Sequence, residues 1–286
     1  MRLVNTLMVV VGLSMVGTQG AIAMPVLEDS LDLNTGVIVN SIAYDPVAGF
    51  LYIHRDFSAD IEVFDQSGSL QFTIAAPGTT SNDFDLDFAD SAINVGGVAI
   101  AANSLLVANG DDSPEILSAL NKNDGSVLAS QVLPSAALVG GAYHFARDSF
   151  FTVDWQSNDL VTEANANNGN LINSFAPTGP NSFDVNYGDI DVFAGTGNLY
   201  IVSDRHDFIR EMTPDGTFVR DIDLAGIPQV FGLSGIAIDD INEIVWVSST
   251  GGTIHKLSGV FTPIPIPAPI LLFVSGLVVL LGRRKR

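Results

Sequence analysis

Three aspartates alternate with apolar residues in one short stretch of the chain, Asp83-Phe84-Asp85-Leu86-Asp87-Phe88. Alternating carboxylates supply the oxygen ligands that calcium prefers, and Asp83, Asp85 and Asp87 match the opening of a D-x-D-x-D calcium loop. That loop also needs glycine at its sixth position and glutamate at its twelfth, where this chain has Phe88 and Asn94. The alternation therefore favours a β-strand with an acidic face and a buried aromatic face over a weak calcium site.

Other residue types that carry chemistry are scarce or scattered. The chain has no cysteine, which excludes disulfides and thiolate chemistry. Its four histidines stand far apart in the sequence, and neither H-E-x-x-H nor G-x-S-x-G occurs. We therefore expect surface or locally hydrogen-bonded histidines. The histidines are His54, His144, His206 and His255.

A repeated strand–turn–strand pattern positions these residues. Each copy opens with an apolar strand, turns at Asp, Asn, Gly or Pro residues, and continues with a second apolar strand, as in residues 235–248. The opening residues are 56, 45, 47 and 46 positions apart. In order they are Ile42, Val98, Tyr143, Ile190 and Ile236.

Four of the copies continue with a second hairpin. Its turns contain Asp-Gly, Asn-Gly or Ser-Gly between alternating apolar residues, which is a strong hairpin signal. Four strands in about 46 residues is the spacing of a β-propeller blade. The fifth copy has three strands, and residues 25–33 resemble the missing fourth. The sequence therefore predicts an all-β fold, a single propeller over residues 24–262 with five blades, six being the alternative, whose ring an N-terminal strand closes.

The copies resemble the NHL and YVTN families of propeller repeats, in which Gly-Ile-Ala-Val-Asp is followed by Leu-Tyr-Val; here residues 235–239 read Gly-Ile-Ala-Ile-Asp. The resemblance implies that the opening strands line a central channel. Some such propellers are lactonases or phosphotriesterases that hold calcium or zinc there through Asn, Asp and Glu. The matching positions here offer Asn94, Asn186, Asp189 and Asp191 but no glutamate. Close packing of small residues at the axis explains the pairs Gly96-Gly97 and Gly140-Gly141 in these strands better than a metal site does.

Charge limits the partners that the chain can bind. Five of its twelve basic residues lie outside residues 24–262, so this stretch has seven basic and 32 acidic residues and a net charge of −25. Such a surface repels nucleic acid and anionic headgroups and suits an exported protein or divalent cations.

The N-terminal 23 residues have the pattern of a secretory signal peptide. Arg2 precedes an apolar run at 7–16, and Ala21 and Ala23 form an A-x-A cleavage site. This predicts export through the Sec translocon. An anchor helix is the weaker interpretation, because the apolar run is too short to cross a bilayer.

The C-terminal segment, residues 263–286, combines a proline motif, an apolar stretch and a basic end. Residues 268–282 would form a helix about 22 Å long, a marginal anchor for a core of roughly 30 Å. The basic end would stay cytoplasmic. The motif residues are Pro265, Pro267 and Ala268, and the basic residues are Arg283, Arg284, Lys285 and Arg286.

This three-part tail resembles the PEP-CTERM sorting signals of Gram-negative bacteria, in the variant with a V-P-L-P-A core. The resemblance implies an exosortase, a membrane protease that removes the tail, and a route from the inner membrane to the cell surface. An ordinary C-terminal anchor is the alternative. Bacteria with such proteins tend to make exopolysaccharide, which makes polysaccharide or surface proteins the expected partners.

The sequence as a whole favours a non-catalytic binding or scaffold module at the cell surface. The alternative is a calcium- or zinc-dependent hydrolase that uses the channel acids. Calcium is the one cofactor that the acids suggest, through Asp83, Asp85, Asp87, Asn94, Asp189 and Asp191.

Overall fold

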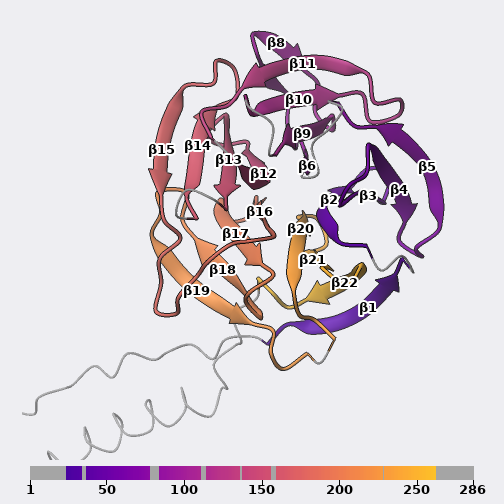
Figure 1. The fold of residues 1–286 in the computed structure, drawn as a ribbon, viewed down its shortest axis with the longest axis vertical. Coiled ribbons are helices and arrows are strands. Elements are labelled where there is room, and N and C mark those ends of the chain that lie inside the picture. Colours follow the sequence, from indigo (N-terminus) through magenta and orange to yellow (C-terminus); the bar gives the residue numbers. More distant parts are fainter. Residues whose placement is uncertain are drawn as a thin grey trace, which may run out of the picture. The chain divides into compact units, whose positions relative to one another are not determined.

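The computed structural model describes residues 24–33, 37–77, 84–110, 114–135, 137–155, 159–227 and 229–261, which lie in one compact unit, Met24–Phe261. Every regular element in these ranges is a β-strand. The strands form five four-stranded sheets and one separate two-stranded hairpin. Figure 1 shows the sheets standing as blades around a central axis. The fold is the five-bladed propeller that the repeat predicts, and the six-bladed alternative is wrong.

Each blade runs from an inner strand at the axis to an outer edge strand (Figure 1). Blade 1 comprises β2 (Val39–Asp45), β3 (Phe50–Arg55), β4 (Asp60–Asp65) and β5 (Leu70–Ala75). Blade 2 comprises β6 (Phe84–Phe88), β9 (Leu105–Asn109), β10 (Ile116–Leu120) and β11 (Val127–Val132). Blade 3 comprises β12 (Leu138–His144), β13 (Ser149–Asp154), β14 (Val161–Asn165) and β15 (Leu171–Phe175).

The last two blades complete the ring. Blade 4 comprises β16 (Gly188–Phe193), β17 (Asn198–Ser203), β18 (Phe208–Met212) and β19 (Phe218–Asp223). Blade 5 comprises β20 (Leu233–Asp239), β21 (Ile244–Ser249), β22 (Thr253–Ser258) and, at its outer edge, β1 (Val26–Asp32).

Strand β1 closes the ring as the sequence predicts. It pairs antiparallel with β22, with Leu31 opposite Ile254 and Ser30 opposite His255. The Ser30 hydroxyl also lies 2.9 Å from Nδ1 of His255, which joins the two strands through side chains. The N-terminal segment of the unit is thereby tied to the C-terminal blade, and β1 covers the edge of β22 that would otherwise be unpaired.

Apolar side chains fill the space between neighbouring blades. The buried residues form five clusters, one at each of the five junctions between blades. At the junction of blades 5 and 1, Trp246 packs on Tyr44 with ring centroids 6.2 Å apart. Burying one large apolar side chain stabilises the fold by about 1.5–3 kcal/mol, so these junctions hold the ring together.

The predicted opening residues of blades 2 and 3 are wrong. Val98 does not open blade 2, because it lies in an inserted hairpin of β7 (Ile93–Val95) and β8 (Val98–Ile100). The inner strand of blade 2 is instead the acidic stretch β6, whose strand character was predicted. In blade 3 the anchor Tyr143 was placed two residues late, since Tyr143 pairs with Phe150 as Val192 pairs with Leu199.

None of the described residues forms a helix long and apolar enough to cross a membrane. The predicted signal peptide, residues 1–23, and the predicted sorting tail, residues 263–286, lie outside the described residues.

Candidate functional site

Two pairs of aspartates occupy equivalent positions on the inner strands of blades 2 and 4. Asp85 and Asp87 lie on β6, and Asp189 and Asp191 lie on β16. The ladders fix the equivalence, because Asp87 opposes Leu106 as Asp191 opposes Tyr200. We call Asp85 and Asp189 the lower pair, and Asp87 and Asp191 the upper pair.

The other three inner strands carry only small residues at these positions. A Cβ atom on Gly140 would lie 2.6 Å from Cα of Asp189, and one on Gly235 would lie 3.2 Å from Cα of Ser41. The inner strands therefore approach too closely for larger side chains, which confirms the crowding predicted for Gly140-Gly141. The other predicted pair, Gly96-Gly97, lies instead in the turn of the hairpin β7–β8. The positions are Ser41, Gly140 and Gly235 beside the lower pair, and Ala43, Ala142 and Ala237 beside the upper pair.

The upper pair ties neighbouring blades together. Asp87 Oδ2 accepts a hydrogen bond from the Tyr143 amide of blade 3 at 2.6 Å. Asp191 Oδ2 accepts one from the Ile238 amide of blade 5, also at 2.6 Å. Each carboxylate spans from its own strand to the next inner strand, so each supports the ring as well as lining its channel.

A cavity of about 340 Å³ opens above the upper pair, among the turns that follow the inner strands. We call it the mouth. Its walls are partly apolar, and no Lys, Arg or His is among the described residues that line it. The apolar and aromatic residues are Tyr44, Pro46, Phe88, Phe145, Val192, Ala194, Ile238 and Ile241. The acids are Asp87, Asp90, Asp191 and Asp240.

The pKa values of three mouth acids, Asp87, Asp191 and Asp240, are raised because their carboxyls are removed from water beside other acids. Burial, and then the Asp191 charge, raises the pKa of Asp87 well above its usual value. Burial also raises the pKa of Asp191, with the Asp240 and Asp90 charges contributing. Burial raises the pKa of Asp240 to about 7, although the Ala194 amide donates to it. A cation bound in the mouth would reverse these shifts by stabilising the carboxylates.

The structure brings together four of the six predicted metal-site residues. Asp85, Asp87, Asp189 and Asp191 share the channel, whereas Asn94 lies exposed on the hairpin strand β7. Asn94 was predicted to line the channel, and this is wrong because its strand is an insertion outside the blade. Asp83 lies outside the described residues. Within the described ranges, no three His, Asp or Glu side chains are arranged to hold a metal ion.

Sequence reasoning missed Asp90 and Asp240 as mouth residues. It also missed that the aspartates of β6 and β16 lie together in the channel. A signal was present, because Asp85-Leu86-Asp87 and Asp189-Ile190-Asp191 share the pattern Asp-apolar-Asp. Aligning blade 2 on that pattern would have placed both pairs on the axis.

The histidines are locally bonded, as expected. His54 Nε2 lies 2.9 Å from the Ser58 carbonyl, and His144 Nε2 lies 3.0 Å from the Gly197 carbonyl. Burial lowers the pKa of His54 to about 4, which keeps its ring neutral. They lie in different blades and form no common site.

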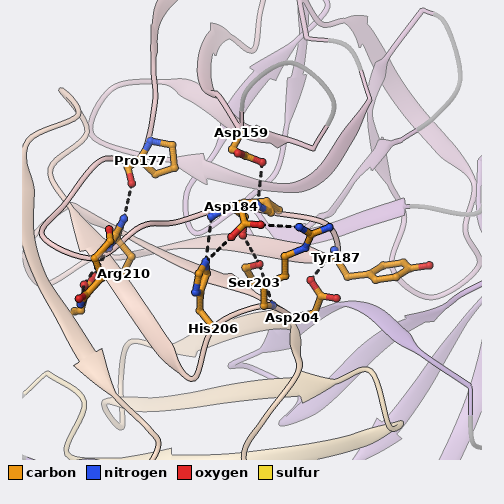
Figure 2. Close-up of polar contacts among 12 residues, drawn as sticks. Asp159, Pro177, Asp184, Tyr187, Ser203, Asp204, His206 and Arg210 are labelled. Carbon is orange, nitrogen blue, oxygen red and sulfur yellow. Dashed lines mark hydrogen bonds and ion pairs between the residues drawn. The ribbon is translucent and has the colours of Figure 1, made fainter.

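A second polar cluster lies at the opposite end of blade 4, where the loop 176–187 leads into β16 (Figure 2). Its centre is Arg210, which is fully buried. The guanidinium donates to both oxygens of Asp221, at 2.8 and 3.0 Å, and to the carbonyls of Pro177 and Asn181. It also lies 4.7 Å from the Phe183 ring centroid. Every charge here has an internal partner.

The same loop is held by further short contacts, which Figure 2 draws as dashed lines. Asp184 accepts hydrogen bonds from Arg205 at 2.6 Å and pairs with His206 at 3.0 Å. Asp159 accepts from the Val185 amide at 2.9 Å, and Asp204 accepts from the Tyr187 amide at 3.1 Å. A cavity of about 180 Å³ borders the loop. We interpret this cluster as structural, because its cations already have acidic partners.

No protein-family model and no curated protein matches this chain. Solved structures do match in fold. The Myxococcus xanthus glutaminyl cyclase superposes with a TM-score of 0.62 at 11% identity, over 84% of this chain and 97% of the enzyme. A protein of unknown function from Bacteroides caccae superposes with a TM-score of 0.50 at 15% identity, over 75% of this chain and 71% of the other. At these identities the likeness shows the fold alone.

Proposed function

We propose that this chain is an exported binding module whose mouth takes a cationic organic ligand. One observation supports the proposal most directly: four carboxyls and an apolar wall share a cavity of about 340 Å³ that has no basic residue among its described lining. Acids crowded in this way favour a positive ligand. The volume lies within the usual range for small-molecule sites.

The arrangement favours an organic cation over a metal ion. A calcium site needs roughly six to eight oxygen ligands at about 2.3–2.6 Å. Among the described residues, no three acids are arranged to form such a site. An ammonium group can lie farther from several carboxylates, while its carbon skeleton contacts Tyr44, Phe145 and Ile241. The metal-dependent hydrolase therefore has less support than the binding module.

The cell-surface setting rests on the sequence. The A-x-A site after an apolar run supports export, and the tail with Pro265, Pro267 and Ala268 supports sorting by an exosortase. The repeats resemble NHL and YVTN propellers. In this proposal the mature module lies at the surface or in the polysaccharide matrix, where an amine-bearing glycan is the natural ligand class. The likeness to the glutaminyl cyclase is one of fold alone and does not bear on the ligand.

The proposal is tested by calorimetric titration of the full chain with a glucosamine oligomer, with the N-acetylated oligomer as the uncharged control. Asp90→Asn should weaken binding about tenfold, the effect of losing one charged contact of about 1.4 kcal/mol. Asp207→Asn makes the same charge change at an exposed position outside the mouth and should leave binding unchanged. Equal binding of both oligomers would refute the preference for a cationic ligand, and equal loss in both variants would refute the mouth as the site.

A further inference from the structure

The lower pair differs from the mouth in being fully closed to solvent. Asp85 and Asp189 each have no exposed surface, and neither lines the cavity. Both carboxyls lie against the adjacent residues Gly140 and Gly141, where a Cβ on Gly140 would be 3.1 Å from Asp189 Oδ1 and one on Gly141 would be 2.9 Å from Asp85 Oδ2. The two carboxyls also interact directly with each other. Two carboxylates cannot both remain charged at such short range without water or a cation between them.

The hydrogen-bond donors around the pair are unequal. Both oxygens of Asp189 accept backbone amides, Oδ1 from Ile190 at 2.7 Å and Oδ2 from Ile236 at 2.9 Å. Asp85 Oδ1 accepts the Ser41 hydroxyl at 3.0 Å. Asp85 Oδ2 is buried without a hydrogen-bond partner of ordinary geometry among the described residues, although the Gly141 amide is near the carboxyl. Three of the four oxygens thus accept a hydrogen bond of ordinary geometry, and Asp85 Oδ2 accepts none.

We propose that the lower pair binds a single proton, carried by Asp85 and donated to the Asp189 carboxylate across the propeller axis. The carboxyl O–H then satisfies the oxygen that lacks a donor, while Asp189 keeps its charge and both amide hydrogen bonds. The hydrogen bond joins β6 to β16, two inner strands that are not neighbours in the ring. It therefore braces the axis from blade 2 to blade 4.

The groups around the pair strengthen this preference for a proton. At the level of the pair, the strands β2, β12 and β20 contribute Ser41, Gly140 and Gly235, none of which titrates. The acids nearest in the channel are the upper pair, with Asp90 and Asp240 at the mouth, and each of them adds a like charge when it ionises. The remaining titratable side chains of the inner strands lie toward the turns at the strand ends: Tyr44, Asp45, Tyr143, His144 and Asp239.

The stability of the folded chain should fall as the pH rises, because of the pKa values of the lower pair. Burial raises the pKa of both carboxyls in the folded state, whereas an unfolded aspartate has a pKa of about 3.9. The folded state therefore binds more protons above about pH 4, and the stabilisation is lost as pH rises through the folded pKa of the pair.

Thermal unfolding of the full chain between pH 5 and pH 8.5 tests the proposal. Asp85→Asn mimics the protonated acid, because its amide can donate to Asp189. Its midpoint should fall less with rising pH than that of the wild type, and at pH 8.5 it should be higher by roughly 2–4 °C. Asp189→Asn, which loses an acceptor for a backbone amide, should melt lower at every pH.

A spectroscopic readout separates protonation from a merely structural role. The infrared band of a protonated carboxyl should be present in the wild type at neutral pH and should weaken in Asp85→Asn. Ser41→Ala, which removes a donor to the ionised form, should move the midpoint of that titration to higher pH. The proposal is overturned by an unchanged band and pH profile in Asp85→Asn. It is also overturned by a calcium-induced rise in the wild-type melting temperature that Asp85→Asn abolishes, since a cation would then occupy the place of the proton.

Discussion

The mouth and the Arg210 cluster use aspartates in opposite ways. At the cluster, Asp221 and Asp184 face arginines, and the Arg210 donors are occupied by partners within the chain. At the mouth, four aspartates share a cavity with no basic residue among its described lining. The aspartates of the two regions therefore have different roles. Where charge is balanced internally, acids hold a loop in place, and where it is not, the balance is left for protons or a ligand.

Breaking the cluster should have the largest effect. Arg210→Ala removes a fully buried guanidinium and leaves Asp221 with uncompensated charge, so we expect a loss of about 3–5 kcal/mol in the free energy of unfolding. Urea denaturation of the full chain measures it. Ligand binding by the folded fraction should be unchanged, because the cluster lies at the far end of blade 4. A loss below 1 kcal/mol would show that the cluster is not the structural anchor.

Within the mouth, Asp191→Asn should have a smaller effect on stability. The amide replaces one acceptor oxygen, so the hydrogen bond from either Val192 or Ile238 is lost, at a cost of about 1–3 kcal/mol. Asp90→Asn, at an exposed position on the mouth, should leave the unfolding midpoint nearly unchanged. Equal destabilisation by the two variants would contradict the assignment of Asp191 to ring stability and of Asp90 to ligand contact.

The pH dependence of binding should sharpen the contrast further. A tetraalkylammonium ion keeps its charge at all pH values, so its affinity reports the protein groups alone. Because burial raises the pKa of Asp240 to about 7, affinity should rise between pH 5.5 and pH 8.5, by about tenfold for each carboxyl that ionises. Titrations across this range check it. In Asp240→Asn the rise should be reduced, and an affinity that falls with pH would exclude the carboxylates as the contacts.

The smallest effect is expected for Arg205→Ala. Arg205 pairs with Asp184 at 2.6 Å, but the two side chains are 52% and 46% exposed. Exposed pairs contribute at most about 1 kcal/mol, and salt weakens them. Thermal melts at low and high salt should show a shift of a few degrees or less. A loss as large as that of Arg210→Ala would mean that burial does not distinguish the two arginines.

The architecture was accessible from the sequence because it follows from local signals. Asn-Gly and Asp-Gly turns between alternating strands fix hairpins, and Gly125 and Gly216 adopt the positive φ of 73° and 85° that those turns need. The short fifth copy predicted the closing strand β1. The inserted hairpin β7–β8 misled the alignment because it is itself an apolar strand–turn–strand unit.

The sites were less accessible because they depend on contacts between distant segments. Asp85 and Asp189 are more than a hundred positions apart, and only the ring brings them together. Arg210 is buried by Pro177, Asn181 and Phe183, which belong to a loop with no repeat pattern. The pattern Asp-apolar-Asp, shared by β6 and β16, was the one signal for the first arrangement, and residue spacing within blade 4 gave none for the second.

A structure of the protein soaked with the glucosamine oligomer would test the central claim most directly. The claim predicts an amine of the oligomer in the mouth among Asp87, Asp90, Asp191 and Asp240, with its ring against the apolar wall. An occupied site elsewhere on the propeller, with the mouth left open at saturating ligand, would contradict it.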